Sequence, residues 1–501
     1  NLYCFHCGIT SFDFYTFCYN TKCWKYKSQC SNNTKNMGIT MKSVALHNLG
    51  CKVNNYELDV MQQMLQEKGY KIVPFDERAD IYIVNTCTVT NIADRKSRQM
   101  LHRARKINPQ AVVVAVGCYV QTGKDRIVKD GTVDLAIGNN RKKDLIMILE
   151  NYLSGQREAQ ETGETAAGAG LSEPDAADER ADTPGLYMID INHTCEYEEM
   201  TLKRTAEHTR AYIKIQDGCN QFCSYCVIPY ARGRVRSRRQ EDVLREVQGI
   251  AGEGYQEIVL TGIHISSYGM DRGGCELLPL LEKLHEIEGI KRIRLGSLEP
   301  RIVTEEFALR ISGMPKVCPH FHLSLQSGSD SVLRRMNRRY DSEEYFRATA
   351  YLRRFYENPA ITTDVIVGFP GETQEEFQET EDFLRRVNFF EMHIFKYSKR
   401  QGTRAAEMEG QLTEAEKGRR STVLMETERQ MSRTYRAGFI GRQVEVLFEE
   451  KQQMKDGQTY WIGHTTQYIK AAKAALDGEN LHNKILSSVI RGFLEEDVML
   501  V

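Results

Sequence analysis

The first regular alternation of apolar and polar positions begins near residue 41. Three short, mostly apolar runs are separated by helix-length stretches in which apolar residues recur every three or four positions. The strand-like runs cover residues 43–46, 81–85 and 112–116, and the helix-like stretches cover residues 55–68 and 95–107. Buried β-branched runs joined by amphipathic helices are typical of parallel sheets. The pattern predicts an open α/β domain over residues 41–152.

A second series of six strand-like runs follows, each separated from the next by an amphipathic stretch of helix length. These runs cover residues 211–216, 257–261, 292–297, 320–325, 363–367 and 393–397. Six β/α repeats predict a partial (β/α)6 barrel over residues 206–436, with a charged helix at 414–433 near its end. Strand-like alternation at 444–448 and 459–464 then predicts a small β-barrel over residues 437–501. The predicted class is α/β with a small β domain behind it.

Two segments lack a repeating pattern of apolar and polar positions. Residues 1–40 contain five cysteines and no Met before Met37, so we expect upstream sequence wrongly joined to the reading frame, with Met37 or Met41 as the start. A small zinc site built on Cys4 and Cys7 is the alternative. Residues 153–205, rich in Ala, Gly, Glu and Asp at their start, predict an acidic flexible linker and lead-in.

Composition narrows the class of protein. Hydrophobic residues make up 41% and charged residues 27% of the 501 positions, as in soluble globular proteins. No stretch approaches the roughly 18 consecutive apolar residues of a membrane span, and the start lacks a secretory signal pattern. We therefore expect a cytoplasmic protein with no membrane partner. The net charge of −1 includes a local −6 over residues 156–185, so the remainder carries +5, which permits a nucleic-acid partner without requiring one.

The strongest chemical signal is a loop with three cysteines directly after the first strand of the second series. Cys219, Cys223 and Cys226 lie within eight residues. Three thiolates can hold three corners of a 4Fe-4S cluster and leave the fourth iron open for a ligand. A zinc site or inert thiols are the alternatives, but structural zinc usually takes four protein ligands in pairs, and no second pair lies nearby.

Three further cysteines follow the three strands of the first domain. Cys51, Cys87 and Cys118 each come just after one predicted strand. Because parallel strands end at the same edge of a sheet, the three thiols are expected to converge there. Chance burial of free cysteines in the core is the alternative. The pattern predicts a second three-thiolate cluster.

Taken with the six β/α units, the CxxxCxxC spacing resembles the radical S-adenosylmethionine (SAM) superfamily. Both cysteine sets together, in LGCKVNNYE, NTCTVTNIADRKSRQ, GCYVQ and DGCNQFCSYCVIPYARGRVRSR, resemble the methylthiotransferase family over residues 42–501. Lys52-Val53-Asn54 and Thr88-Val89-Thr90-Asn91 resemble the branch that modifies N6-threonylcarbamoyladenosine beside the tRNA anticodon, at adenosine 37. The small C-terminal barrel resembles a TRAM domain, which binds RNA.

The resemblance implies two 4Fe-4S clusters, with Cys219, Cys223 and Cys226 holding the radical-generating one and Cys51, Cys87 and Cys118 the auxiliary one. SAM would serve as methyl donor and radical source, tRNA as substrate, and an electron donor and a sulfur source as further partners. The alternative functions with the same chemistry are those of a methylthiotransferase acting on isopentenyl-adenosine in tRNA or on a ribosomal protein. An RNA-binding protein with structural metal sites is an alternative of another class.

By the same resemblance, SAM contacts are expected at the strand ends of the barrel. The candidates are Tyr225, Thr261, Gly262, Ser297, Glu299, Gln326, Ser327 and Asp364, although each also has a plain reading as a cap, turn or loop residue. The arginines after the cysteine loop are candidates for RNA phosphates, or for a solvated face paired with Glu241 and Asp242: Arg232, Arg234, Arg236, Arg238 and Arg239. Tyr460, Trp461 and Tyr468 could stack on bases or lie in a core.

Overall fold

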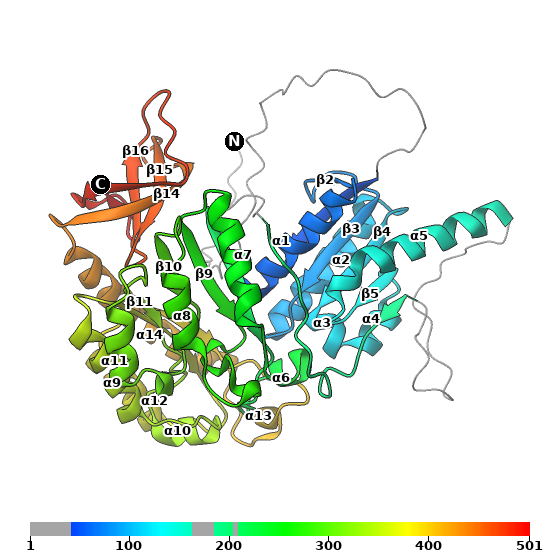
Figure 1. The fold of residues 1–501 in the computed structure, drawn as a ribbon. Helices are drawn as coiled ribbons and strands as arrows, with labels where there is room; N and C mark the ends of the chain where they lie inside the picture. The colour runs from blue at the N-terminus through cyan, green and yellow to red at the C-terminus, as the bar shows by residue number, and fades with distance from the viewer. Residues whose placement is uncertain (1–41, 163–184, 204–208) are drawn as a thin grey trace, which may run out of the picture.

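The computed structural model describes residues 42–162, 185–203 and 209–501 (Figure 1). The predicted N-terminal extension, residues 1–40, lies outside this part of the chain. An α/β domain in blue and cyan stands beside a green and yellow α/β core, and an orange-red β domain lies against the far end of that core (Figure 1). Within the described residues, no helix has the length and apolar character needed to cross a membrane.

The first domain is a six-stranded parallel sheet in the order β2-β1-β3-β4-β5-β6. Its strands are β1 (Ser43–Asn48), β2 (Lys71–Val73), β3 (Ile81–Thr86), β4 (Val112–Gly117), β5 (Leu135–Ile137) and β6 (Leu186–Tyr187). Its helices are α1 (Lys52–Glu67), α2 (Asn91–Ile107), α3 (Cys118–Thr122), α4 (Lys124–Asp130) and α5 (Leu145–Thr162). Every residue of β3 and β4 is buried, which explains why these strands read as continuous apolar runs.

The predicted linker differs from the structure at both of its described ends. Helix α5 continues through residue 162, and β6 pairs in parallel with β5. Leu153 is buried in the hydrophobic core, so the helix continues past the predicted domain boundary at residue 152. Residues 153–162 and 186–187 therefore belong to the first domain, while residues 163–184 lie outside the described part of the chain.

The second unit is a parallel partial barrel, as the sequence predicts. Its strands are β7 (Arg210–Asp217), β9 (Glu257–Gly262), β10 (Arg292–Leu295), β11 (His320–His322), β12 (Ala360–Val367) and β13 (Glu391–Lys396), with a short antiparallel β8 (Arg236–Ser237) at one edge. Its helices are α6 (Ile228–Arg232), α7 (Gln240–Gly252), α8 (Leu277–His285), α9 (Glu305–Ser312), α10 (Asp330–Arg335), α11 (Ser342–Phe355), α12 (Gln374–Val387), α13 (Arg404–Glu407) and α14 (Glu414–Ala437). Isolated bridges such as Leu298–Leu323 join its two groups of strands.

The C-terminal unit is a small, mainly antiparallel β domain. It contains β14 (Gln443–Gln453), β15 (Thr459–Thr465), β16 (Lys470–Ala474), β17 (Lys484–Val489), β18 (Gly492–Phe493) and β19 (Met499–Leu500). Tyr460 and Trp461 are buried in its core. The Tyr468 ring stacks between His320 of the barrel, at 4.8 Å, and His464, at 4.6 Å. These three aromatic side chains hold the domain together and dock it, so they are not free to stack on bases.

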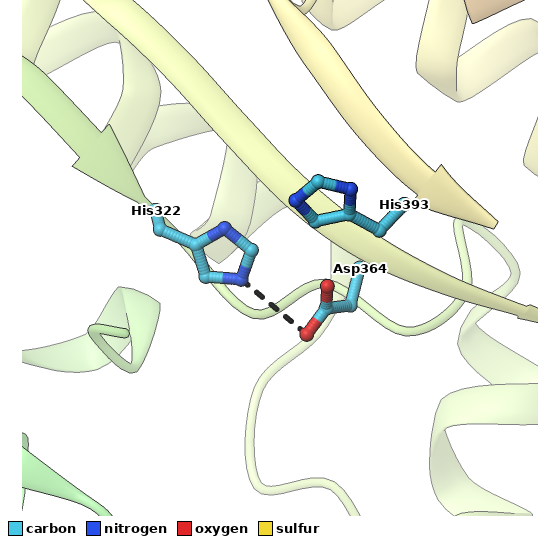
Figure 2. Close-up of side chains that lie close together, drawn as sticks. All are labelled: His322, Asp364 and His393. Carbon is cyan, nitrogen blue, oxygen red and sulfur yellow. Dashed lines mark ion pairs between the residues drawn. The ribbon is translucent and has the colours of Figure 1, made fainter. Parts of the chain in front are cut away.

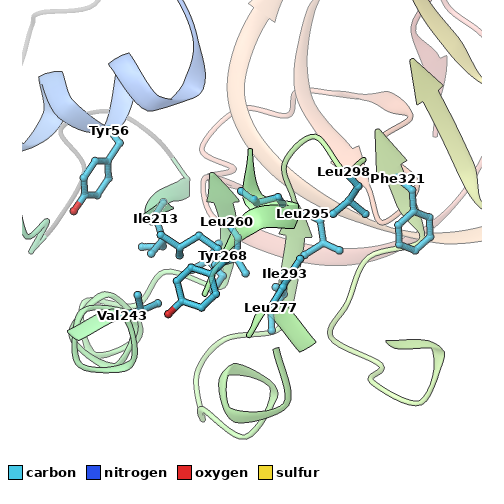
Figure 3. Packing of buried hydrophobic residues seen from close by; sticks show 14 of the residues in the cluster. Tyr56, Ile213, Val243, Leu260, Tyr268, Leu277, Ile293, Leu295, Leu298 and Phe321 are labelled. Atoms are coloured by element: carbon cyan, nitrogen blue, oxygen red, sulfur yellow. The ribbon is translucent and has the colours of Figure 1, made fainter. Parts of the chain in front are cut away.

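Helix α1 belongs to the first domain but packs against the barrel. Its Tyr56 lies in one hydrophobic core with Ile213 of β7, Leu260 of β9 and Val243 of α7 (Figure 3). The Tyr56 hydroxyl donates to the backbone oxygen of Met200 and to the Glu246 carboxylate. Because this core is continuous across the two units, α1 fixes how the first sheet sits on the barrel.

Glu57, the residue directly after Tyr56 on α1, places a buried carboxylate at the same junction. Its oxygens accept from Lys142 of the first domain at 2.8 Å, and from Lys214 and Arg232 of the barrel at 2.8 and 2.9 Å. Burial alone would raise the pKa of Glu57, but Arg232, Lys142 and Lys214 hold this pKa well below its usual range. Buried charges are tolerated only when they are paired, so this cluster is possible only with both domains in place.

We expect Glu57→Gln to lower the free energy of unfolding by about 3–5 kcal/mol, because three buried cations lose their carboxylate. Thermal and urea denaturation of the purified protein would measure the change. Glu67→Gln on the same helix is the matched control, since it removes only an exposed pair with Lys203 and should cost less than about 1 kcal/mol. Equal effects of the two substitutions would contradict the assignment of Glu57 as the centre of the junction.

Candidate active site

The three cysteines of the first domain converge at one edge of its sheet. Cys51 follows β1 and precedes α1, Cys87 follows β3, and Cys118 opens α3 directly after β4. The Cys51, Cys87 and Cys118 thiols interact electrostatically with one another. Gly50 permits this approach, because a Cβ built on it would lie 3.1 Å from the Cys87 sulfur. The parallel register of β1, β3 and β4 thus produces the juxtaposition that the sequence predicts.

The protein environment of this first trio disfavours free thiolates. Burial raises the pKa of the Cys87 thiol to about 12 and also raises the pKa of Cys51, while Arg232 opposes both shifts. Cys51 is nevertheless exposed to solvent. Thiols of this kind become good ligands only when a metal centre supplies positive charge, which fits a bound cluster.

The second trio lies in the loop after β7. Gly218 starts the loop with a φ of 71°, and a Cβ there would lie only 1.8 Å from the backbone oxygen of Arg234. The Asn337 amide donates to the backbone oxygen of Phe222 at 2.9 Å, which fastens the middle of the loop. The Arg338 guanidinium donates to the Cys223 sulfur at 3.2 Å. The sequence did not predict a role for Arg338, because nothing in MNRRY marks this Arg as a neighbour of the cysteine loop.

The spacing of the sulfur atoms favours clusters over zinc. Zinc bound by thiolates at ~2.3 Å would bring its sulfur ligands to roughly 3.8 Å from one another. In the described residues, neither trio has all three sulfur atoms within 4.8 Å. A cubane cluster places additional iron and sulfide between its ligands and requires the wider spacing. Neither trio is therefore spaced for a single zinc ion.

The two cysteine sites meet at a contact between two short helices. Helix α3, which begins at Cys118, packs against α6, which begins two residues after Cys226. The amide of Asn139 lies 3.5 Å from the Cys118 sulfur and donates to the backbone oxygen of Ala231 at 2.7 Å. Asn139 was also missed, although it follows β5 and the strand-end argument that located the cysteines applies to it.

Most of the predicted SAM contacts lie at the ends of the barrel strands. Tyr225 lies in the cysteine loop and packs edge-to-face on Phe369, while Thr261 and Gly262 end β9. Glu299 accepts from Gln221 of the cysteine loop at 2.9 Å and pairs with His264 at 3.2 Å. Three more of the predicted residues lie in the same part of the barrel. Ser297 is exposed beyond β10, Gln326 has a φ of 75° after β11, and Asp364 is on β12.

Ser327, also in the predicted set, lies in the turn after β11. Its hydroxyl lies 3.1 Å from the Thr380 hydroxyl on α12 and accepts from the backbone N–H of Ser329 at 3.2 Å. It is buried between the strand end and the outer helix. These contacts stabilise the turn after β11, and the SAM contact of Ser327 stays a prediction.

The arginine run divides into buried and exposed members. Arg232 pairs with Glu57 and Asp217, Arg236 donates to backbone oxygens of Arg232 and Arg234, and Arg238 pairs with Glu246 and Glu199. Arg232, Arg236 and Arg238 are thus structural and unavailable to RNA, which corrects the prediction. These three arginines are buried because of the tertiary structure, in which α6 and β8 fold back between the two domains. Arg234 and Arg239 remain exposed.

Known families match both α/β parts of the chain. The profile of the radical SAM superfamily matches residues 213–384, and that of uncharacterized protein family UPF0004 matches residues 43–138. The threonylcarbamoyladenosine tRNA methylthiotransferase MtaB of Bacillus subtilis is 38% identical over 86% of this chain and 90% of its own. MtaB of Aquifex aeolicus is 38% identical over 82% of this chain and 94% of its own. A tRNA-2-methylthio-N(6)-dimethylallyladenosine synthase of Moorella thermoacetica is 36% identical over 81% and 87%.

The partial barrel, its three-cysteine loop and the superfamily match define a radical SAM protein, a class that uses SAM and a 4Fe-4S cluster. With relatives of this identity aligned over most of their length, the chain belongs to the methylthiotransferase family of radical SAM enzymes. The family resemblance of the sequence motifs is thereby confirmed.

We expect Arg338→Gln to shift the midpoint potential of the cluster at Cys223 to a more negative value without loss of iron. A cation at 3.2 Å from a ligating sulfur stabilises the reduced, more negative cluster, and the substitution removes that charge. A redox titration followed by electron paramagnetic resonance would measure the potential. Arg335→Gln, which removes a pair with Glu376, is the control and should leave the potential unchanged. An unshifted potential in Arg338→Gln would contradict this role.

Proposed function

We propose that this chain is a tRNA methylthiotransferase that converts N6-threonylcarbamoyladenosine at position 37 into its 2-methylthio derivative. The observation that carries the proposal is the meeting of two three-thiol sites at the α3–α6 contact. The names of the MtaB relatives supply the substrate. Adenine C2 carries a hydrogen that is neither acidic nor a leaving group, so acid–base residues alone cannot replace it and a cofactor must carry that step.

The cysteines divide into two roles in this proposal. Cys219, Cys223 and Cys226 hold the radical-generating cluster, and Cys51, Cys87 and Cys118 hold an auxiliary cluster. When bound, SAM and the two clusters would supply a hydrogen-abstracting radical, sulfur and a methyl group. An electron donor and a sulfur source complete the partners, and the tRNA substrate implies action in the cytoplasm.

The side chains around the clusters have positioning roles. Arg338 donates to Cys223, and Asn139 links Cys118 to the backbone of α6. The strand-end residues are proposed to contact SAM, because the carboxyl ends of parallel strands gather ligand groups in barrels: Tyr225, Thr261, Gly262, Ser297, Glu299, Gln326, Ser327 and Asp364. The Glu57 junction keeps the two cluster sites at a fixed separation.

A second candidate substrate is N6-dimethylallyladenosine in tRNA, because the Moorella relative of that name is 36% identical. A ribosomal-protein substrate, or RNA binding with structural metal sites, would use the same fold. These alternatives differ in product, so the reconstituted enzyme should be incubated with anticodon stem-loops bearing each N6 group and with labelled SAM. Mass spectrometry of the nucleosides identifies the substrate. An absence of any methylthio-adenosine would overturn the proposal.

We expect Cys118→Ala to abolish methylthio transfer while reductive cleavage of SAM continues, because only the auxiliary site loses a ligand. Cys223→Ala should abolish both activities. The products are methylthio-nucleoside, measured by mass spectrometry, and 5′-deoxyadenosine, measured by chromatography. Cys275→Ala is the control: this thiol is exposed, free and outside both trios, and its loss should leave both products at the wild-type level. Methylthio transfer by Cys118→Ala would contradict the auxiliary role.

The exposed arginines Arg234 and Arg239 are the proposed phosphate contacts. Replacing both with Ala should weaken tRNA binding and reduce the slope of log affinity against log salt concentration by about one per arginine. Binding titrations at several salt concentrations would measure this slope. Arg245→Ala on α7 is the control, since Arg245 is equally exposed but pairs with Asp242 on its own helix. A slope equal to that of the wild type would show that these two residues do not contact RNA phosphates.

A further inference from the structure

Lys52 is an ammonium group without an acidic partner. It follows Cys51 directly and begins α1. Among the residues that the structure describes, its side chain makes no hydrogen bond or ion pair, whereas its cationic neighbours Arg210 and Arg294 both pair with Glu257. Lys52 is also exposed to solvent. A basic side chain that remains unpaired beside other paired cations is available for an anionic ligand.

The surroundings of Lys52 show that it faces the interior of the barrel. It interacts electrostatically with Arg210 on β7, Arg294 on β10, Asp364 on β12 and Tyr468 of the C-terminal domain. These residues belong to opposite sides of the partial barrel. A side chain that interacts with all of them is directed toward the strands of the barrel. Lys52 therefore extends from the auxiliary cysteine site toward the barrel strands.

Asp364 belongs to a cluster of three side chains on β11, β12 and β13, formed with His322 and His393. The Nε2 atom of His322 lies 3.4 Å from an Asp364 oxygen, and the His393 ring stacks at 6.0 Å from that of His322 (Figure 2). The ligand atoms of the three lie within 4.8 Å of one another, a spacing that a metal ion could also use. Lys52 interacts with both Asp364 and His393. One carboxylate facing this lysine, with Arg294 also nearby, leaves no surplus negative charge for a divalent cation and favours an anion.

We propose that Lys52 binds the carboxylate of the substrate's N6-threonylcarbamoyl group, with His322 and His393 lining the same subsite. This inference rests on the proposed function and names its specificity-determining contact. The threonyl group carries a free carboxylate, whereas a dimethylallyl group carries no charge. Adenine C2 and N6 are on one ring, so a residue that binds the end of the N6 substituent must lie within the length of a nucleobase plus that substituent from the sulfur-donating site. Lys52, adjacent to the ligand Cys51, meets this requirement.

The test compares two anticodon stem-loops that differ only in one group: the threonyl carboxylate, or the corresponding carboxamide. Wild-type enzyme should prefer the carboxylate in kcat/KM by roughly 10- to 100-fold, the range expected for a charge-assisted contact. Lys52→Met should lose this preference, so that the two substrates react at similar rates, and Lys52→Arg should retain most of it. Lys68→Met, at the C-terminal end of the same helix, is the control and should discriminate as the wild type does.

Iron content and substrate-free cleavage of SAM equal to those of the wild type would show that Lys52→Met retains both clusters. Equal slowing of both substrates by Lys52→Met, or an undiminished preference for the carboxylate, would overturn the inference. So would a stoichiometric non-iron metal that is lost in His322→Ala, since it would assign the three side chains to a cation. Failure of the wild type to modify either stem-loop would instead overturn the proposed function.

Discussion

The arrangement of this protein depends on a carboxylate placed where no water can solvate it. Glu57 is on a helix of one domain, and two of its three cationic partners, Lys214 and Arg232, come from the other. Separating the domains would leave buried charges of both signs unpaired, so the junction admits one relative orientation. Asp217 joins the same cluster through Lys214 and Arg232 immediately before the second cysteine loop. The ion pairs that join the domains therefore also fix the start of that loop.

The junction has a further effect on the thiols. Arg232 pairs with Glu57 and also interacts with Cys51, Cys87 and Cys118. One guanidinium from the barrel thus supplies positive charge to the three thiols of the neighbouring domain. The interaction depends on the tertiary structure, because residues 51, 87, 118 and 232 come together only after both sheets have formed.

Features with a local cause could be predicted from the sequence, and features with a tertiary cause could not. The parallel strands and the convergence of Cys51, Cys87 and Cys118 follow from buried apolar runs and from the common edge of parallel strand ends. The burial of Arg236 and Arg238 could not be predicted, because a dense arginine run resembles a phosphate-binding surface until its acidic partners are placed. Likewise, the contact between the Ser327 and Thr380 hydroxyls could not be predicted, because Thr380 lies on a helix distant in sequence.

Gly218 shows how little variation the cysteine loop allows. Its positive φ disfavours any side chain, and a Cβ would penetrate the backbone of Arg234 at 1.8 Å. That backbone belongs to the segment between α6 and β8, so no flexible side chain can yield. A missense change at this codon would displace Cys219 and its neighbours even though every cysteine is still encoded. In a genetic screen, such an allele would have the phenotype of a deleted gene.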